Sequence, residues 1–183
     1  MVNAGLVERF AAAAREAGAE VLGVSGLNAA FSAVAGLLDK EKTKKVAASA
    51  AVQAAGCADR LLVSLPRNPQ EFSQTRVSLV RADYGIAETG TLVRLDSDDG
   101  EKMLWTLAAT CVCLLDRDRI VPDVESLAGV LSEHLSRPGT PGSQVSLVTG
   151  PSRTADIECQ LTIGVQGPSR LVIILVAGAR GGR

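Results

Sequence analysis

The residues best equipped for chemistry form one short cluster, Ser152, Arg153 and Thr154. They follow an apolar segment at 145–148, which predicts a buried strand, and Gly150, which together with the next proline marks a turn. We predict a helix over 154–161 after this turn. At a helix start, free backbone N–H groups and the positive end of the helix dipole attract anions. One guanidinium and two hydroxyls at that point predict a pocket for a small anion, bound in part by Gly150.

Two acids, Asp156 and Glu158, lie within one turn of Arg153 in this segment. Asp156 is a candidate acid–base residue, and Glu158 is a candidate for holding the guanidinium of Arg153 in place. The alternative is structural, because Ser152 or Thr154 can simply cap a helix that begins here. A strict capping box is absent, since neither residue is followed three positions later by Glu or Gln.

A second candidate segment, Ala87-Glu88-Thr89-Gly90-Thr91, places one carboxylate and two hydroxyls around a glycine. A glycine permits a positive φ or a close approach of the backbone to a ligand, so we take Thr89, Gly90 and Thr91 as candidate ligand-binding residues. Glu88 is the candidate acid–base group or nucleophile of this segment. The alternative is a polar turn that leads into a strand over 91–95.

Size and composition restrict the class of protein. The chain has 183 residues, of which 46% are hydrophobic and 21% are charged, so we expect a single globular domain over 1–183. A formal net charge of −1 and an aromatic content of 3% argue against nucleic-acid binding. The longest apolar stretch, 104–115, contains two threonines and is shorter than the roughly 20 residues of a membrane-spanning helix. Because Glu8 and Arg9 interrupt any apolar leader, we expect a cytoplasmic protein without membrane contact.

The sequence offers little support for a metal site or a histidine-based catalytic triad. Its four cysteines, Cys57, Cys111, Cys113 and Cys159, form no C-x-x-C pair, so the spacings typical of zinc and ferredoxin-type cluster sites are absent. Cys111 and Cys113 alternate on a predicted strand, which favours two buried structural thiols on one face. The single histidine, His134, is expected at the solvated end of a helix.

Hydrophobic periodicity predicts helices and strands in alternation. We expect helices over 6–17, 27–38, 50–55 and 123–135, and strands over 20–24, 46–48, 61–63, 77–80 and 171–176. Such alternation is typical of βαβ units. The predicted fold is therefore a three-layer α/β/α arrangement with a mainly parallel sheet covered on both faces.

Three further segments complete the prediction. We expect a charged hairpin-like loop over 96–102, followed by a long buried strand over 105–115. The Pro- and Gly-containing segment 136–143 predicts a flexible loop or lid, and 177–183 predicts a flexible tail.

The two candidate segments together resemble the lactate utilisation protein C family, also called the LUD domain. The resemblance is carried by Ile86-Ala87-Glu88-Thr89-Gly90-Thr91, by Gly150-Pro151-Ser152-Arg153-Thr154-Ala155-Asp156-Ile157-Glu158, and by Gly164-Val165-Gln166-Gly167-Pro168. It covers roughly the second half of the chain. The third motif departs from the family pattern at Gln166, where we expect histidine, so no proton-transfer role is assigned there.

The resemblance implies the fold of glucosamine-phosphate isomerase, ribose-phosphate isomerase and CoA transferases. It also implies a role in oxidising L-lactate to pyruvate beside iron–sulfur partner proteins. Because the chain carries no cluster or flavin motif, we expect an accessory subunit without a cofactor of its own. The alternative is a stand-alone isomerase- or transferase-like enzyme acting on a phosphorylated or CoA-linked substrate.

Both functions place the ligand in one cleft. In open α/β sheets, ligands bind beyond the carboxyl ends of strands. We therefore expect the loops that carry Glu88 and Arg153 to meet, with Arg153 binding a carboxylate or phosphate in bidentate fashion.

Overall fold

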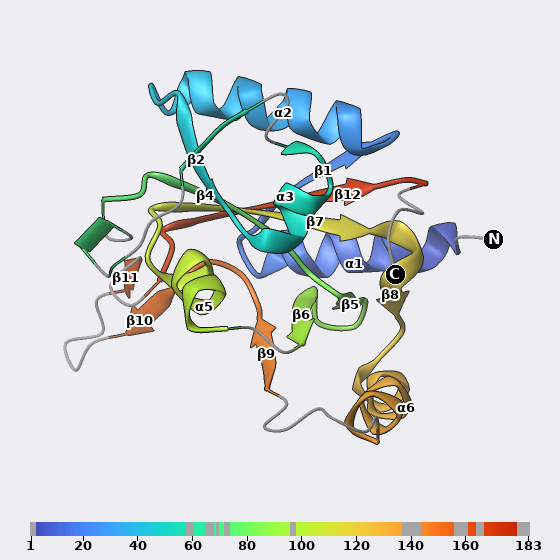
Figure 1. The fold of residues 1–183 in the computed structure, drawn as a ribbon. Coiled ribbons are helices and arrows are strands. Elements are labelled where there is room, and N and C mark those ends of the chain that lie inside the picture. Colours follow the sequence, from blue (N-terminus) through green and yellow to red (C-terminus); the bar gives the residue numbers. More distant parts are fainter. Residues whose placement is uncertain are drawn as a thin grey trace.

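The main feature of the computed structural model is a six-stranded sheet in the order β1-β12-β7-β4-β2-β3 (Figure 1). The structure describes residues 3–57, 61–64, 68, 70–71, 74–95, 98–136, 144–155, 161–163 and 167–178. The strands of this main sheet are β1 (Glu20–Val24), β2 (Lys45–Ala48), β3 (Leu62–Ser64), β4 (Val77–Arg81), β7 (Thr110–Asp116) and β12 (Arg170–Val176). Every neighbouring pair is parallel, as the alternation of elements predicts.

Helices cover both faces of the main sheet, which gives the predicted three-layer α/β arrangement (Figure 1). On one face lie α1 (Ala4–Glu16) and α5 (Asp99–Thr106), and on the other lie α2 (Leu27–Lys40) and α3 (Ala50–Ala54). The central strands β7 and β12 are buried on both sides, which explains their nearly continuous apolar sequence.

A smaller sheet, in the order β8-β5-β6-β9, packs on the α1 side of the main sheet. Its strands are β5 (Tyr84–Ile86), β6 (Thr91–Leu95), β8 (Ile120–Val121) and β9 (Val145–Val148). Strand β6 is antiparallel to both β5 and β9, whereas β8 is parallel to β5. Helix α6 (Val124–Leu135) covers part of this sheet, where Leu127 packs with Ile86 and Val93.

Helix α5 replaces the hairpin-like loop and the first part of the strand predicted over 105–115. Asp98 accepts a hydrogen bond from the backbone N–H of Glu101 at 2.7 Å, so a carboxylate caps the helix and Glu occupies its third position. Trp105 lies on this helix and is buried against the main sheet. The strand begins only at Thr110, after the chain has turned.

Two predictions about the C-terminal half were also wrong. Strand β9 exists, but it is an edge strand of the small sheet, with Val145 38% and Leu147 57% exposed, and it is not buried. The predicted helix does not begin at Thr154. Instead, β10 (Arg153–Ala155) pairs with β11 (Leu161–Ile163) as an antiparallel hairpin.

The Pro- and Gly-containing loop predicted at 136–143, of which only Ser136 is described, and residues 179–183 of the tail predicted at 177–183 lie outside what the structure describes. Among the described residues, no helix combines the length and the apolar character needed to cross a bilayer.

Candidate functional site

The second candidate segment, 87–91, forms the turn between β5 and β6 and ends at Thr91, the first residue of β6. The backbone N–H of Ala87 donates to Val121 O at 2.8 Å, and that of Glu88 donates to Pro122 O at 3.0 Å. These bonds tie the turn to the end of β8. Ala87 is buried, whereas Glu88 and Thr89 are exposed. The turn therefore presents a carboxylate and a hydroxyl to solvent from a fixed backbone.

Three threonine hydroxyls connect this turn to the end of β9. Thr91 Oγ1 lies 2.6 Å from Thr89 Oγ1 and 2.7 Å from Thr149 Oγ1. Thr91 is buried, while Thr89 and Thr149 are exposed. The contact follows from the register of β6 and β9, in which Leu92 lies opposite Val148. The second candidate segment thus contacts Thr149, which directly precedes Gly150 of the first segment and which sequence reasoning had not singled out.

The glycines of both segments have a structural function against helix α1. Gly90 has φ +66°, and a Cβ atom there would lie 2.2 Å from the backbone N of Ala14. Gly150 has φ +71°, and its Cβ would lie 2.3 Å from the carbonyl oxygen of Ala17. Only glycine combines this backbone conformation with such close contact. The close approach expected between Gly90 and a ligand is, in the structure, an approach to the C-terminal half of α1.

The third motif reaches the same place through Gly167 and Pro168. The backbone N–H of Ser152 donates to Pro168 O at 2.9 Å, and a Cβ at Gly167 would lie 2.9 Å from Ser152 Cβ. We call residues 87–91, 149–152 and 167–168 the motif junction. Three stretches separated in sequence thus come together beside the end of α1.

The position of this junction differs from the expected one. Gly150 follows β9 of the small sheet, and Gly167 and Pro168 precede β12, so the junction lies near the amino ends of the main-sheet strands. The rule on carboxyl ends of parallel strands therefore does not apply to it, because β9 belongs to a different sheet.

Several predicted site residues cannot be placed at side-chain level. Arg153 and Thr154 are described only as backbone of strand β10. Asp156, Glu158 and Gln166 lie outside the described residues.

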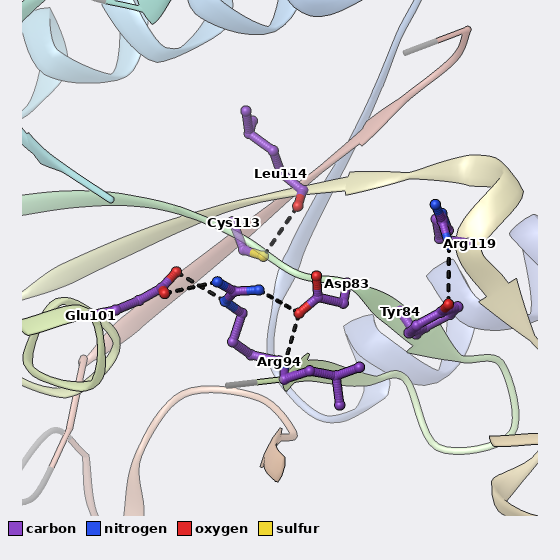
Figure 2. A network of polar contacts seen from close by, with 8 residues as sticks. Asp83, Tyr84, Arg94, Glu101, Cys113, Leu114 and Arg119 are labelled. Carbon is purple, nitrogen blue, oxygen red and sulfur yellow. Dashed lines mark hydrogen bonds and ion pairs between the residues drawn. The ribbon is translucent and has the colours of Figure 1, made fainter. Parts of the chain in front are cut away.

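A network of charged residues that sequence reasoning missed lies beside strands β5 and β6 (Figure 2). Arg94 on β6 donates through Nε and Nη2 to the two carboxylate oxygens of Glu101 on α5, at 3.0 and 2.9 Å. Its Nη1 donates to Asp83 Oδ2 at 2.5 Å, and the same oxygen accepts from Leu95 N at 2.8 Å. The Arg94 side chain is only 17% exposed.

These ion pairs attach the small sheet to α5 at a position that is largely shielded from solvent. Burial by itself lowers the pKa of Arg94, but hydrogen bonds to Glu101 and Asp83 outweigh it, so the pKa is raised. The pairing of β5 with β6 is the signal from which the contact between Asp83 and Arg94 could have been predicted. Tyr84 lies opposite Val93, so Asp83 and Arg94 lie opposite each other at the next position, as the members of a cross-strand ion pair do.

The prediction of two buried thiols on one strand face is confirmed for Cys111 and Cys113. Cys111 and Cys113 are buried in the core on the α1 face, and Cys57 is buried on the α2 face. Burial raises the pKa of Cys111 to about 12, so this thiol stays protonated and unreactive in the folded protein. Cys159 lies outside the described residues.

Fold and motif junction together define a three-layer α/β protein with an added mixed sheet. The model of the LUD domain family matches residues 66–176, more than half of the chain, so the protein belongs to the LUD domain family. This confirms the resemblance carried by the three motifs.

Curated relatives and one solved structure agree with this assignment. A protein named lactate utilization protein C from Geobacillus kaustophilus is 30% identical over 110 residues, 60% of this chain and 46% of the relative. Its namesake from Bacillus subtilis is also 30% identical over 110 residues. In Escherichia coli, a protein named uncharacterized protein YkgG is 30% identical over 109 residues, 60% of this chain and 47% of that protein. The chain spans about half the length of the curated relatives it matches.

The crystal structure of a DUF162 family protein from Deinococcus radiodurans has a similar fold. It superposes with a TM-score of 0.69 at 23% identity, covering 96% of this chain and 98% of that chain. The likeness extends over nearly the whole chain, beyond the part matched by the family model.

Proposed function

We propose that this protein is an accessory subunit of an L-lactate utilisation system, with iron–sulfur partner proteins that carry the electrons. The names of the relatives from Geobacillus and Bacillus support the lactate assignment. Oxidation of lactate requires a group that accepts two electrons. We expect such groups on the partner proteins, so no cofactor is assigned to this chain.

Within this function, the motif junction holds a small anion such as the lactate carboxylate. The observation that carries this assignment is the hydrogen bond of 2.7 Å between Thr91 and Thr149, which joins the two motif segments. Three hydroxyls in a row supply three protons, and the two internal bonds use two of them. When the two bonds run head to tail, one terminal hydroxyl, Thr89 or Thr149, has a proton left to donate, and both residues are exposed. Arg153 is proposed to add its guanidinium from β10.

Acid–base chemistry at the junction is assigned to Glu88, whose carboxylate is exposed on the turn next to Thr89. Asp156 is proposed as a second acid and Glu158 as the partner that orients Arg153. The proposal gives Thr89, Gly90, Thr91, Gly150, Ser152 and Thr154 the binding role.

The first test is growth on L-lactate after deletion of the gene, with complementation by variants. The wild-type chain and Thr106→Val should restore growth, because Thr106 is an exposed threonine on α5 whose hydroxyl bonds only within its helix. Thr149→Val and Arg153→Gln should fail to restore it while the proteins accumulate to the same level. Unimpaired growth of the deletion strain would contradict the lactate role.

The second test separates the partner claim from the ligand claim. Affinity purification of the wild-type protein from lactate-grown cells should enrich iron–sulfur proteins, and Thr149→Val should enrich them equally. Loss of growth with unchanged partners then assigns the threonine to ligand binding. Absence of iron–sulfur proteins from the purified fraction would overturn the accessory role even if lactate binds.

A further inference from the structure

Strand β9 is the terminal strand of the small sheet, in the order β8-β5-β6-β9 (Figure 1). It pairs with β6 on one side, and no described strand pairs with its other side, which we call the open edge. Residues 144–149, which include the strand, carry no charge and no proline. An edge strand without charge or proline is a template on which a second strand can pair.

The hydrogen bonds of β6 show which of its backbone groups face β9. Val93 O accepts from Asp83 N at 2.8 Å, and Leu95 N donates to Asp83 Oδ2 at 2.8 Å, so the backbone groups of Val93 and Leu95 point toward β5. Successive residues of a strand direct their N–H and C=O groups to opposite sides. The groups of Leu92 and Arg94 therefore point toward β9.

The same alternation identifies the groups of β9 that point to the open edge. Val148 and Ser146 lie opposite Leu92 and Arg94, so their N–H and C=O groups are used within the sheet. Val145 and Leu147 direct theirs to the open edge. The side chains of these two residues share one face, and the residues are 38% and 57% exposed. The open edge thus combines outward backbone donors and acceptors with exposed apolar side chains.

The other edge strands of the two sheets have features that oppose pairing. Strand β1 carries Glu20, and Arg15 Nη2 donates to its Val21 O at 3.2 Å. Strand β3 has three residues, and β8 has two. Charged side chains and short length are common means of preventing contact between sheet edges. Strand β9 is longer than β3 and β8 and lacks the charges found at β1.

We propose that β9 pairs with β9 of a second copy of this chain, antiparallel about a two-fold axis that passes beside Ser146. Val145 then lies opposite Leu147 of the second copy, and Leu147 lies opposite Val145 of the second copy. Both pairs consist of residues whose backbone groups point outward, so each pair exchanges both of its N–H···O bonds. The two small sheets become one continuous sheet.

The occupant is a second copy because the open edge is complementary to itself. The two-fold axis places an uncharged strand against an uncharged strand, with valine beside leucine at both ends. These side chains extend the apolar face on which Val93 and Leu95 are buried with Leu127 of α6. A two-fold contact uses one surface twice and closes, whereas pairing β9 with a different edge would leave an unpaired β9 in the assembly.

The first test is sedimentation equilibrium of the purified protein. Because only two short strands meet, we expect a dissociation constant on the order of 10 μM. Between about 1 and about 200 μM the mass should rise from that of one chain, 18.9 kDa, toward twice this value. Leu147→Lys should raise the dissociation constant at least about tenfold, because it places a charge on the paired edge. The matched control is Val124→Lys at the start of α6, where the residue is 54% exposed, and it should change the constant less than about twofold.

A second variant separates backbone pairing from apolar contact. Leu147→Pro removes an outward N–H group, adds no charge, and leaves the bonds of Ser146 and Val148 to β6 in place. It should therefore weaken the dimer, whereas thermal melting at about 1 μM, where the monomer dominates, should still show a cooperative transition.

Cysteine cross-linking tests the register. Ser146 lies opposite its own copy at a position without backbone bonds between the strands, where Cα atoms are about 4.5 Å apart. Ser146→Cys should therefore form a disulfide-linked dimer with oxidised glutathione as the oxidant. Gln144→Cys is the control, because this exposed residue lies opposite Val148 of the second copy and should link no more than the wild type does.

Three results would overturn the proposal: a wild-type protein with the mass of one chain at about 200 μM, a Leu147→Lys variant that dimerises like the wild type, or equal linking of Ser146→Cys and Gln144→Cys. A monomeric wild type that loses a co-purifying protein on Leu147→Lys would assign the open edge to another protein and would equally overturn self-pairing. None of these variants alters the motif junction, so the outcome is independent of the lactate assignment.

Discussion

The main sheet and the small sheet of this protein are stabilised in different ways. In the main sheet, β12 is flanked by parallel neighbours, and its Leu171–Val176 stretch is buried on both faces. In the small sheet, β9 is an edge strand with exposed apolar side chains. Close backbone contacts at Gly90 and Gly150 and the charged network of Arg94 attach this small sheet to α1 and α5. The main sheet is therefore stabilised by apolar burial, whereas the small sheet, which carries the family motifs, is attached by a few specific polar and steric contacts.

The largest effect should come from removing the charged attachment. Arg94→Met leaves the carboxylates of Glu101 and Asp83 without their cation in a mostly desolvated place, so the free energy of unfolding should fall by about 3–5 kcal/mol. Lys102→Met is the control, because Lys102 pairs with the exposed Asp99 and should cost less than about 1 kcal/mol. Urea unfolding checks both. Equal losses would mean that the network does not anchor the small sheet.

Apolar truncation should separate the two sheets directly. Ile173→Ala on β12 removes a side chain that is 0% exposed and should lower the free energy of unfolding by about 2–5 kcal/mol. Leu147→Ala on β9 truncates a side chain that is 57% exposed and should cost less than about 1 kcal/mol. If Leu147→Ala were as destabilising as Ile173→Ala, burial would not distinguish the two sheets.

Glycine replacement tests the steric attachment. Gly90→Ala combines a positive φ with a Cβ 2.2 Å from the α1 backbone, so we expect a loss of about 2–4 kcal/mol in the free energy of unfolding. Gly150→Ala should behave similarly, because its Cβ meets the Ala17 carbonyl. Gly129→Ala in the middle of α6 meets no atom within 4 Å and should instead stabilise by up to about 1 kcal/mol. A neutral Gly90→Ala would show that the turn can leave α1 without cost.

The smallest expected effect concerns pH and the amino edge of the main sheet. The hydrogen bond and charge of Arg170 lower the pKa of Glu20 from its ordinary value of 4.5, against the effect of burial. A lowered folded-state pKa gives stability that is fully present above the unfolded pKa and is lost as pH falls through the folded one. The stability of the wild type should therefore decline slightly more than that of Glu20→Gln below about pH 4.5. Parallel thermal-melting curves of the two proteins over that range would contradict the assignment.

Sequence-based prediction was more accurate for the main sheet than for the small sheet. Strand β1 was predicted to the residue, and α1, α2 and β12 to within a few residues, because periodic apolar patterns report burial in the main sheet. The errors lie near the small sheet and the charged segments. Helix α5 was missed although Asp98 and Glu101 form a capping pattern, because Trp105 and its apolar neighbours read equally well as a strand. The segment at 153–155 pairs with 161–163, a pairing that no local sequence pattern predicts.

For the candidate site, the motifs identified the segments but not their arrangement. Residue types alone marked 87–91 and 150–158 as candidate segments, and the structure joins the first of them to Thr149, directly before the second. Both glycines were expected to serve a ligand, yet their contacts are with α1. Helix α1 is distant from both motifs in sequence, so only the folded chain reveals that contact.

The amino-acid sequence by itself determined the family, the parallel main sheet and the burial of Cys111 and Cys113, because apolar periodicity and distinctive motifs are local properties of the chain. The tertiary structure alone decided that the motif glycines contact α1, that Arg94 bridges two acids, and that Arg81 pairs with Asp116. Those contacts join residues far apart in the chain, and their free energy depends on desolvation and close approach, which arise only when the chain is folded.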